Sequence, residues 1–196
     1  MSRTAMGAPI GIGRLRTAWN AAHEPVPGVS AWTRRLAYAV PLVVLPSSLW
    51  RLPAMFDSGI GVGERLYVPL LSVVSELLAF TAIGLVARWG EVFPRWLPRL
   101  RGRRVPVRLA VVPAVMGAMV LTVMFSLVTP ITTVMGKTIR GDELPPDAPG
   151  QGTGIASVWF YSCYAPLVLW GPLLAVLTAA YWRRRRRADG VSAAAR

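Results

Sequence analysis

The sequence predicts an all-α, polytopic membrane protein with four transmembrane helices and both termini in the cytoplasm. Hydrophobic residues make up 54% of the 196-residue chain, and its mean hydropathy is +0.46. Charged residues make up only 16%, below the share of about 25% that is usual in soluble domains. The chain contains several apolar runs that approach the length needed to cross a bilayer. The 22 basic and 9 acidic residues lie mostly between these runs, which excludes a soluble enzyme and a free-standing nucleic-acid binder.

The chain divides into three parts. Residues 1–30 are small, polar and interrupted by prolines and glycines, so we expect a disordered, basic cytoplasmic arm. Residues 31–187 form the predicted four-helix transmembrane domain, and residues 188–196 form a short cytoplasmic tail. The predicted spans cover about residues 36–55, 66–87, 107–130 and 156–182.

The first two spans differ in their polar content. The first contains Pro41 and Pro46, each of which removes a backbone hydrogen bond and favours a kink. Arg51 lies near its end, where a long basic side chain reaches the head groups. The second span contains one charge, Glu76. Length and hydropathy therefore predict a membrane helix in both cases.

The last two predicted spans are the longest of the four. The third is interrupted by Arg108 near its start and by Pro113. The fourth belongs to a run of uncharged residues from Ile155 to Trp182, which is long enough to cross the bilayer with a tilt.

The distribution of basic residues predicts the orientation. Of the 22 Lys and Arg residues, 18 lie before the first span, between the second and third, or after the fourth. The other two connections hold only 4. Because basic residues stay on the cytoplasmic side, both termini are predicted to be cytoplasmic. Of the basic residues 21 are Arg, which together with abundant Ala, Gly, Pro and Val indicates a high-GC bacterial genome and hence a bacterial plasma membrane.

Glu76 is the candidate functional residue within the membrane. An unpaired carboxylate is costly in hydrocarbon, so we expect Glu76 to be protonated, to face other helices or to line a wet cavity. Ser72 precedes it by one helical turn and supplies a hydroxyl on the same face. Two interpretations remain open: an acid that joins helices, and a proton-coupled or cation-binding carboxylate. We favour the first, because no second acid or base lies at a comparable depth.

The third span carries a ridge of small residues at four-residue intervals. Such a ridge lets another helix approach closely, and its hydroxyls form hydrogen bonds across the contact. The fourth span repeats the pattern with Gly171, Ala175 and Ala179. The ridge of the third span consists of Ala110, Ala114, Ala118, Thr122 and Ser126.

A run of arginines directly follows the fourth span, and each basic residue near the surface contributes about 1 kcal/mol to binding anionic head groups. Nucleic acid would need the same charge, but the membrane is adjacent, so the predicted partner is the anionic lipid bilayer and not nucleic acid. The run consists of Arg183, Arg184, Arg185, Arg186 and Arg187.

The reactive residues argue against an enzyme. A single cysteine, Cys163, excludes an intrachain disulfide, and the single histidine, His23, has no second His or Cys for a zinc site. We predict no catalytic residue, no metal ligand and no cofactor. A lipid-handling enzyme is the weakest alternative, because its acids would have to come from the flexible loop that contains Asp142, Glu143 and Asp147.

Two segments carry a resemblance to a known group of proteins. They are WGEVFPRWLPRLRGRRVPV from Trp89 and YAPLVLWGPLLAV from Tyr164. With them the chain resembles small uncharacterised four-span integral membrane proteins of actinobacteria, over roughly residues 32–187. The resemblance implies the four-span fold and brings no activity. We therefore expect a non-enzymatic accessory or assembly component of the plasma membrane, packed as a homo-oligomer or against a larger membrane partner. The alternative is a small proton- or cation-coupled transporter that uses Glu76.

Overall fold

The computed structural model describes residues 13, 16–17, 26–56, 59, 61–92, 102–144, 148 and 150–194. Within these residues the chain is helical, and its only β-type pairings are two isolated bridges. The all-helical prediction is therefore confirmed. Three described helical segments are long and apolar enough to cross a membrane, which suggests a membrane-embedded protein. They are Arg65–Leu85, Val107–Val134 and Ile155–Gly190.

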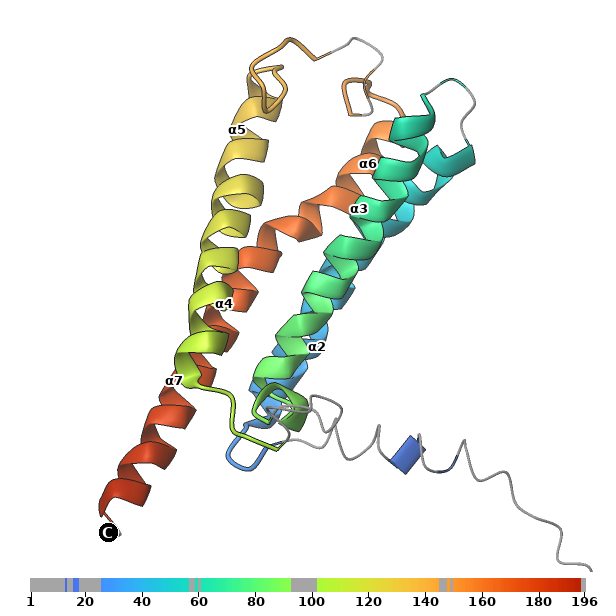
Figure 1. The fold of residues 1–196 in the computed structure, drawn as a ribbon. Coiled ribbons are helices and arrows are strands. Elements are labelled where there is room, and N and C mark those ends of the chain that lie inside the picture. The colour runs from blue at the N-terminus through green and yellow to red at the C-terminus, as the bar shows by residue number, and fades with distance from the viewer. Residues whose placement is uncertain are drawn as a thin grey trace, which may run out of the picture.

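Two antiparallel helices form one side of the bundle (Figure 1). Helix α2 (Ala31–Arg51) begins five residues before the predicted span, because the Ser30 hydroxyl caps it by accepting a hydrogen bond from the Thr33 N–H at 3.1 Å. The helix continues through both of its prolines and ends in a 3₁₀ segment, η1 (Leu52–Phe56). Helix α3 (Val62–Thr81) runs back beside α2 and ends in η2 (Ala82–Leu85).

The third helical segment stands on the other side of the bundle (Figure 1). It consists of α4 (Val107–Leu121), a π-helical stretch labelled η4 (Thr122–Val128) and α5 (Thr129–Val134). The wide turns of η4 lie directly before Pro130, whose missing N–H leaves the regular hydrogen-bond ladder one donor short. The chain continues through Pro113 without such a change.

The fourth segment is bent in its middle and connects the two sides (Figure 1). Helix α6 (Ile155–Tyr164) lies beside α2, a 3₁₀ stretch η5 (Ala165–Leu169) follows, and α7 (Trp170–Ala194) packs against α4. Proline residues at 166 and 172 weaken the hydrogen-bond ladder at this bend. Helix α7 also differs from the sequence-based prediction, because it runs past residue 182 into the predicted tail. Arginine and alanine are strong helix formers, which explains the extension.

The helices pass alternately between two ends of the bundle (Figure 1). The connections from η1 to α3 and from α5 to α6 lie at one end. Residues 26–30, the short η3 (Arg88–Gly90) and the end of α7 lie at the other. The buried apolar residues come mainly from α2, η2 and α7. The predicted arm lies mostly outside the described residues.

Burial is unequal among the three candidate spans. In the most apolar window of Val107–Val134 only 6% of the residues are buried, compared with 44% in that of Arg65–Leu85 and 33% in that of Ile155–Gly190. Helix α4 makes its main tertiary contact with α7 alone. The third span is therefore held on one side and open on the others.

Candidate functional site

Glu76 lies near the middle of the second candidate span, at the edge of the contact between α3 and α2. The Ser48 hydroxyl of α2 donates a hydrogen bond to Glu76 Oε2 at 3.4 Å. Ser48 is buried, and Glu76 is half-buried. The acid therefore faces another helix, which is one of the environments that its cost in hydrocarbon predicts.

Ser72 does not have the role that its spacing from Glu76 predicts. Its hydroxyl is buried and donates to the Val68 carbonyl of its own helix at 3.2 Å. A serine hydroxyl commonly makes this bond to the preceding turn, which leaves Glu76 to a residue of another helix. The described partner of the acid is 28 positions away in the sequence, in α2.

A second polar contact lies one turn further along α2. Arg51 donates from Nε to the Ser47 carbonyl at 3.0 Å and from Nη2 to the Ser47 hydroxyl at 3.1 Å. Its guanidinium carbon lies 5.9 Å from the centre of the Tyr164 ring of α6. The side chain thus points back along its helix and is half-buried in protein, although its position near the end of the span predicts a contact with head groups.

The small-residue ridge of the third span divides into two parts. Its second half packs against the fourth segment: Ala118 is buried, and the Ser126 hydroxyl donates to the Val168 carbonyl at 2.8 Å. That carbonyl needs a donor, because the residue four positions later is Pro172, which has no N–H. The predicted hydrogen bond across the helices is thus present, and the bend explains why it is needed.

Gly171 makes the closest approach between the two helices. A Cβ atom at this position would lie 2.5 Å from the backbone N and 2.8 Å from the Cα of Thr122. Only glycine lets the backbones come so close. Ala175 and Ala179, which continue the pattern in the sequence, are exposed and line a shallow groove beside α4. Of the three small residues predicted to pack closely on the fourth span, Gly171 therefore does so.

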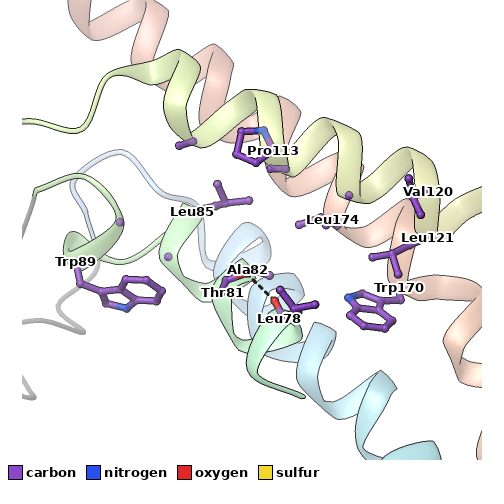
Figure 2. A pocket seen from close by; sticks show the side chains of 15 residues that line it. Leu78, Thr81, Ala82, Leu85, Trp89, Pro113, Val120, Leu121, Trp170 and Leu174 are labelled. Carbon is purple, nitrogen blue, oxygen red and sulfur yellow. Dashed lines mark hydrogen bonds between the residues drawn. The ribbon is translucent and has the colours of Figure 1, made fainter. Parts of the chain in front are cut away.

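The first half of the ridge lines a cavity instead of closing on a helix. Ala110 and Ala114 line an apolar cavity of about 470 Å³ between η2 and the α4–α7 pair, shown from close by in Figure 2. The one side-chain hydroxyl in its lining, that of Thr81, donates to the Leu78 carbonyl at 2.6 Å. Glu76 is not among the lining residues. The cavity therefore has an apolar surface that offers no described acid.

The run of arginines at the end of the fourth span is divided between two environments. Arg184 Nη2 lies 2.6 Å from Glu91 Oε1 and donates to the Leu85 carbonyl at 3.2 Å. Arg185 Nη2 donates to the Val105 carbonyl at 2.9 Å. Both side chains are therefore bound to the connection between α3 and α4, and the predicted contact of the run with lipid stays a prediction. The remaining members, Arg183, Arg186 and Arg187, are exposed.

Sequence reasoning missed two partners, Ser48 and Glu91. The adjacent hydroxyls of Ser47 and Ser48 in an otherwise apolar span were a usable signal for the first. Glu91 is the one acid in the basic stretch from residue 88 to 108, and an isolated acid among arginines indicates an ion pair. Their exact partners depend on how the helices pack, which spacing along one helix does not reveal.

The described residues contain no group of three or more His, Cys, Asp or Glu side chains that could hold a metal ion. Comparison with protein-family models, with curated proteins and with solved structures finds no match to this chain. The resemblance to four-span actinobacterial proteins stays a prediction.

Proposed function

We propose that this chain is a non-enzymatic accessory or assembly component of the bacterial plasma membrane. The observation that carries the proposal is the engagement of Glu76 by Ser48 from a neighbouring helix. A transport path needs a polar-lined space that reaches the acid, whereas the apolar cavity beside α3 does not include Glu76. The acid of the second span thus acts as a contact between helices.

The proposed topology has four spans and two cytoplasmic termini. Helix α2 supports it, because 21 residues extend about 31 Å, close to the thickness of the bilayer core of about 30 Å. The helix also lies alongside α3 between the same two ends of the bundle (Figure 1). The bias of basic residues places the end with α7 in the cytoplasm. There the exposed members of the arginine run would contact anionic head groups.

Cysteine labelling in intact cells tests this topology. In a Cys163→Ala background, Thr138→Cys is expected to react with an impermeant maleimide from outside. Arg103→Cys is expected to react only after the cells are opened. Labelling of position 103 but not 138 in intact cells would mean that the orientation is the opposite of the proposed one. Labelling of both positions in intact cells would mean that the segment between them does not cross the membrane.

The assembly role is supported by the outer face of the third span. Val112, Met116, Met119 and Val120 are between 53% and 62% exposed on this face. We propose that it meets a second copy of the chain or a larger membrane partner. Cysteine crosslinking in native membranes tests this: Met116→Cys should crosslink between protein chains, whereas Leu70→Cys on the opposite side of the bundle should not. Equal crosslinking at both positions would indicate random collision.

A pair of substitutions tests the role of Glu76. If the acid joins helices, Glu76→Gln keeps its size and hydrogen-bonding capacity, so the stability in detergent should stay near that of the wild type. Glu76→Leu leaves the Ser48 hydroxyl without its acceptor and should cost about 1–3 kcal/mol. If Gln destabilises the fold as much as Leu does, ionisation of the acid is required and the structural role is wrong.

Proton- or cation-coupled transport is the second candidate function. The observation that favours it is the length of the Ser48–Glu76 contact, 3.4 Å, because hydroxyl–carboxylate bonds are usually 2.5–3.0 Å. The half-buried carboxyl therefore keeps capacity for another ligand. Proteoliposomes with an internal pH dye test this: a proton flux that Glu76→Gln abolishes, in a protein that remains folded, would establish the transporter.

A further inference from the structure

A second, polar pocket lies at the end of the bundle where α7 meets the connection between α3 and α4. It has a volume of about 480 Å³. Unlike the apolar cavity, it is lined by charged side chains from three segments, and we call it the arginine pocket. Its charged residues are Arg88, Glu91, Arg104, Arg184 and Arg185, and residues 26–27, Val92 and Ala188 complete it.

The described charges of the arginine pocket do not balance. Of the four arginines that line it, Arg88 has a further interaction of its own, and the other three face one described carboxylate, that of Glu91. That carboxylate is already engaged by Arg184 at 2.6 Å and by Arg185 at 3.8 Å. The acid of α7, Asp189, is exposed and does not line the pocket. Arg184 and Arg185 are partly buried and Arg104 is exposed, so these three guanidinium groups outnumber the described carboxylate and favour a bound anion.

Donors without a described partner lie at the same place. The side chain of Arg185 is only 12% exposed. Its Nε atom is buried and has no hydrogen-bond partner within the described part of the chain. The Tyr181 hydroxyl is also buried without one. The Tyr181 ring lies 5.5 Å from the guanidinium carbon of Arg184 and 6.0 Å from that of Arg185. Tyr181 does not line the arginine pocket, but Arg185 does, and its Nε is an unsatisfied donor of the kind that an oxyanion satisfies.

We propose that the arginine pocket binds a phosphate group. Guanidinium groups present forked N–H donors that match the oxygens of a phosphate, and several of them around one space favour it over a single-charged carboxylate. The pocket directly follows the apolar part of α7, so a lipid phosphate reaches it as readily as a soluble one. The inference depends on the shape and charge of the pocket and not on which side of the membrane it faces.

Binding measurements on the full chain in a neutral detergent test this proposal with two probes. One is phosphatidylglycerol in mixed micelles, with phosphatidylcholine as the uncharged comparison, and the other is inorganic pyrophosphate. The critical variant is Arg104→Gln, because this exposed side chain lines the pocket and its substitution leaves the backbone bridge to Val92 intact. Arg103→Gln is the matched control, because it removes the same charge from the adjacent exposed residue that does not line the pocket.

We expect phosphatidylglycerol to bind the wild type and the Arg103→Gln variant equally well. Arg104→Gln should weaken binding about tenfold or more, the effect of one charge-assisted hydrogen bond. Pyrophosphate binding that depends on Arg104 in the same way supports the site and identifies a soluble ligand. Equal loss in both variants, or no loss in either, overturns the proposal, because binding would then reflect general surface charge. Circular dichroism of each variant verifies that it is folded.

Discussion

The close approach at Gly171 gives the sharpest prediction about how this bundle is held together. In Gly171→Ala the new methyl group would lie 2.5 Å from the backbone N of Thr122, whereas ordinary contacts begin at 3.4 Å. The nearest atom is the Thr122 hydroxyl oxygen, which can rotate, but the next two are backbone atoms of Thr122 and cannot move away in this manner. The substitution therefore forces α7 and the third segment apart at the point where the ridge packs most closely.

The magnitude follows from these distances. Relieving the overlap requires a separation of about 0.9 Å, and a gap of that size forfeits about a quarter to a half of the dispersion energy between facing atoms. It also lengthens the hydrogen bond between Ser126 and Val168, which is 2.8 Å in the structure. Overpacking of this kind costs about 1–3 kcal/mol. We expect the free energy of unfolding to fall by that amount.

Gly117→Ala is the matched control, because it adds the same methyl group to the same pair of helices. At this position the nearest atom is Leu174 Cδ2 at 3.8 Å, an ordinary contact. The control should be as stable as the wild type, or more stable by up to about 1 kcal/mol through helix propensity. Denaturant titration in detergent, followed by circular dichroism, measures all three proteins. If Gly171→Ala unfolds at the same denaturant concentration as Gly117→Ala, the close approach does not hold the helices together.

Two further predictions use the same titration. Ser126→Ala removes the donor to the Val168 carbonyl and should cost about 1 kcal/mol; unchanged stability would show that another group satisfies this carbonyl. Glu91→Gln removes the ion pair with Arg184 and should cost about 1–3 kcal/mol, because both side chains are only 15% exposed. Asp189→Asn removes one exposed acid of the same helical end and should change stability little. Equal effects of the two acid substitutions would mean that the ion pair contributes nothing specific.

The sequence predicted the features that depend on one segment at a time. Hydropathy located the three apolar helices, because a long apolar helix carries apolar side chains throughout its own segment of the sequence. The four-residue spacing found Thr122 and Ser126 as contact residues, since residues at this interval share a helical face. The helix boundaries were less accurate: the cap at Ser30 lengthened the first helix, and the arginine run continued the last.

The features that depend on two segments escaped prediction. The spacing rule paired Glu76 with Ser72, but the buried serine bonds to its own helix and the acid meets Ser48 of α2. The run of arginines appeared uniform, although its members project in different directions from the helix, and only two of them reach Glu91. Which side of a helix meets a neighbour is decided by the packing of the whole bundle.

The single main neighbour of the third segment has a consequence for the order in which the protein is built. Helices α2 and α3 contact each other and are able to pair as soon as both have been synthesised. Helix α4 packs mainly on α7, which follows it in the chain and leaves the ribosome later. During synthesis the third segment therefore lacks its main neighbour until α7 has been made. A ribosome that stops before α7 would release a paired hairpin and an unattached helix, a form that membrane quality control can recognise.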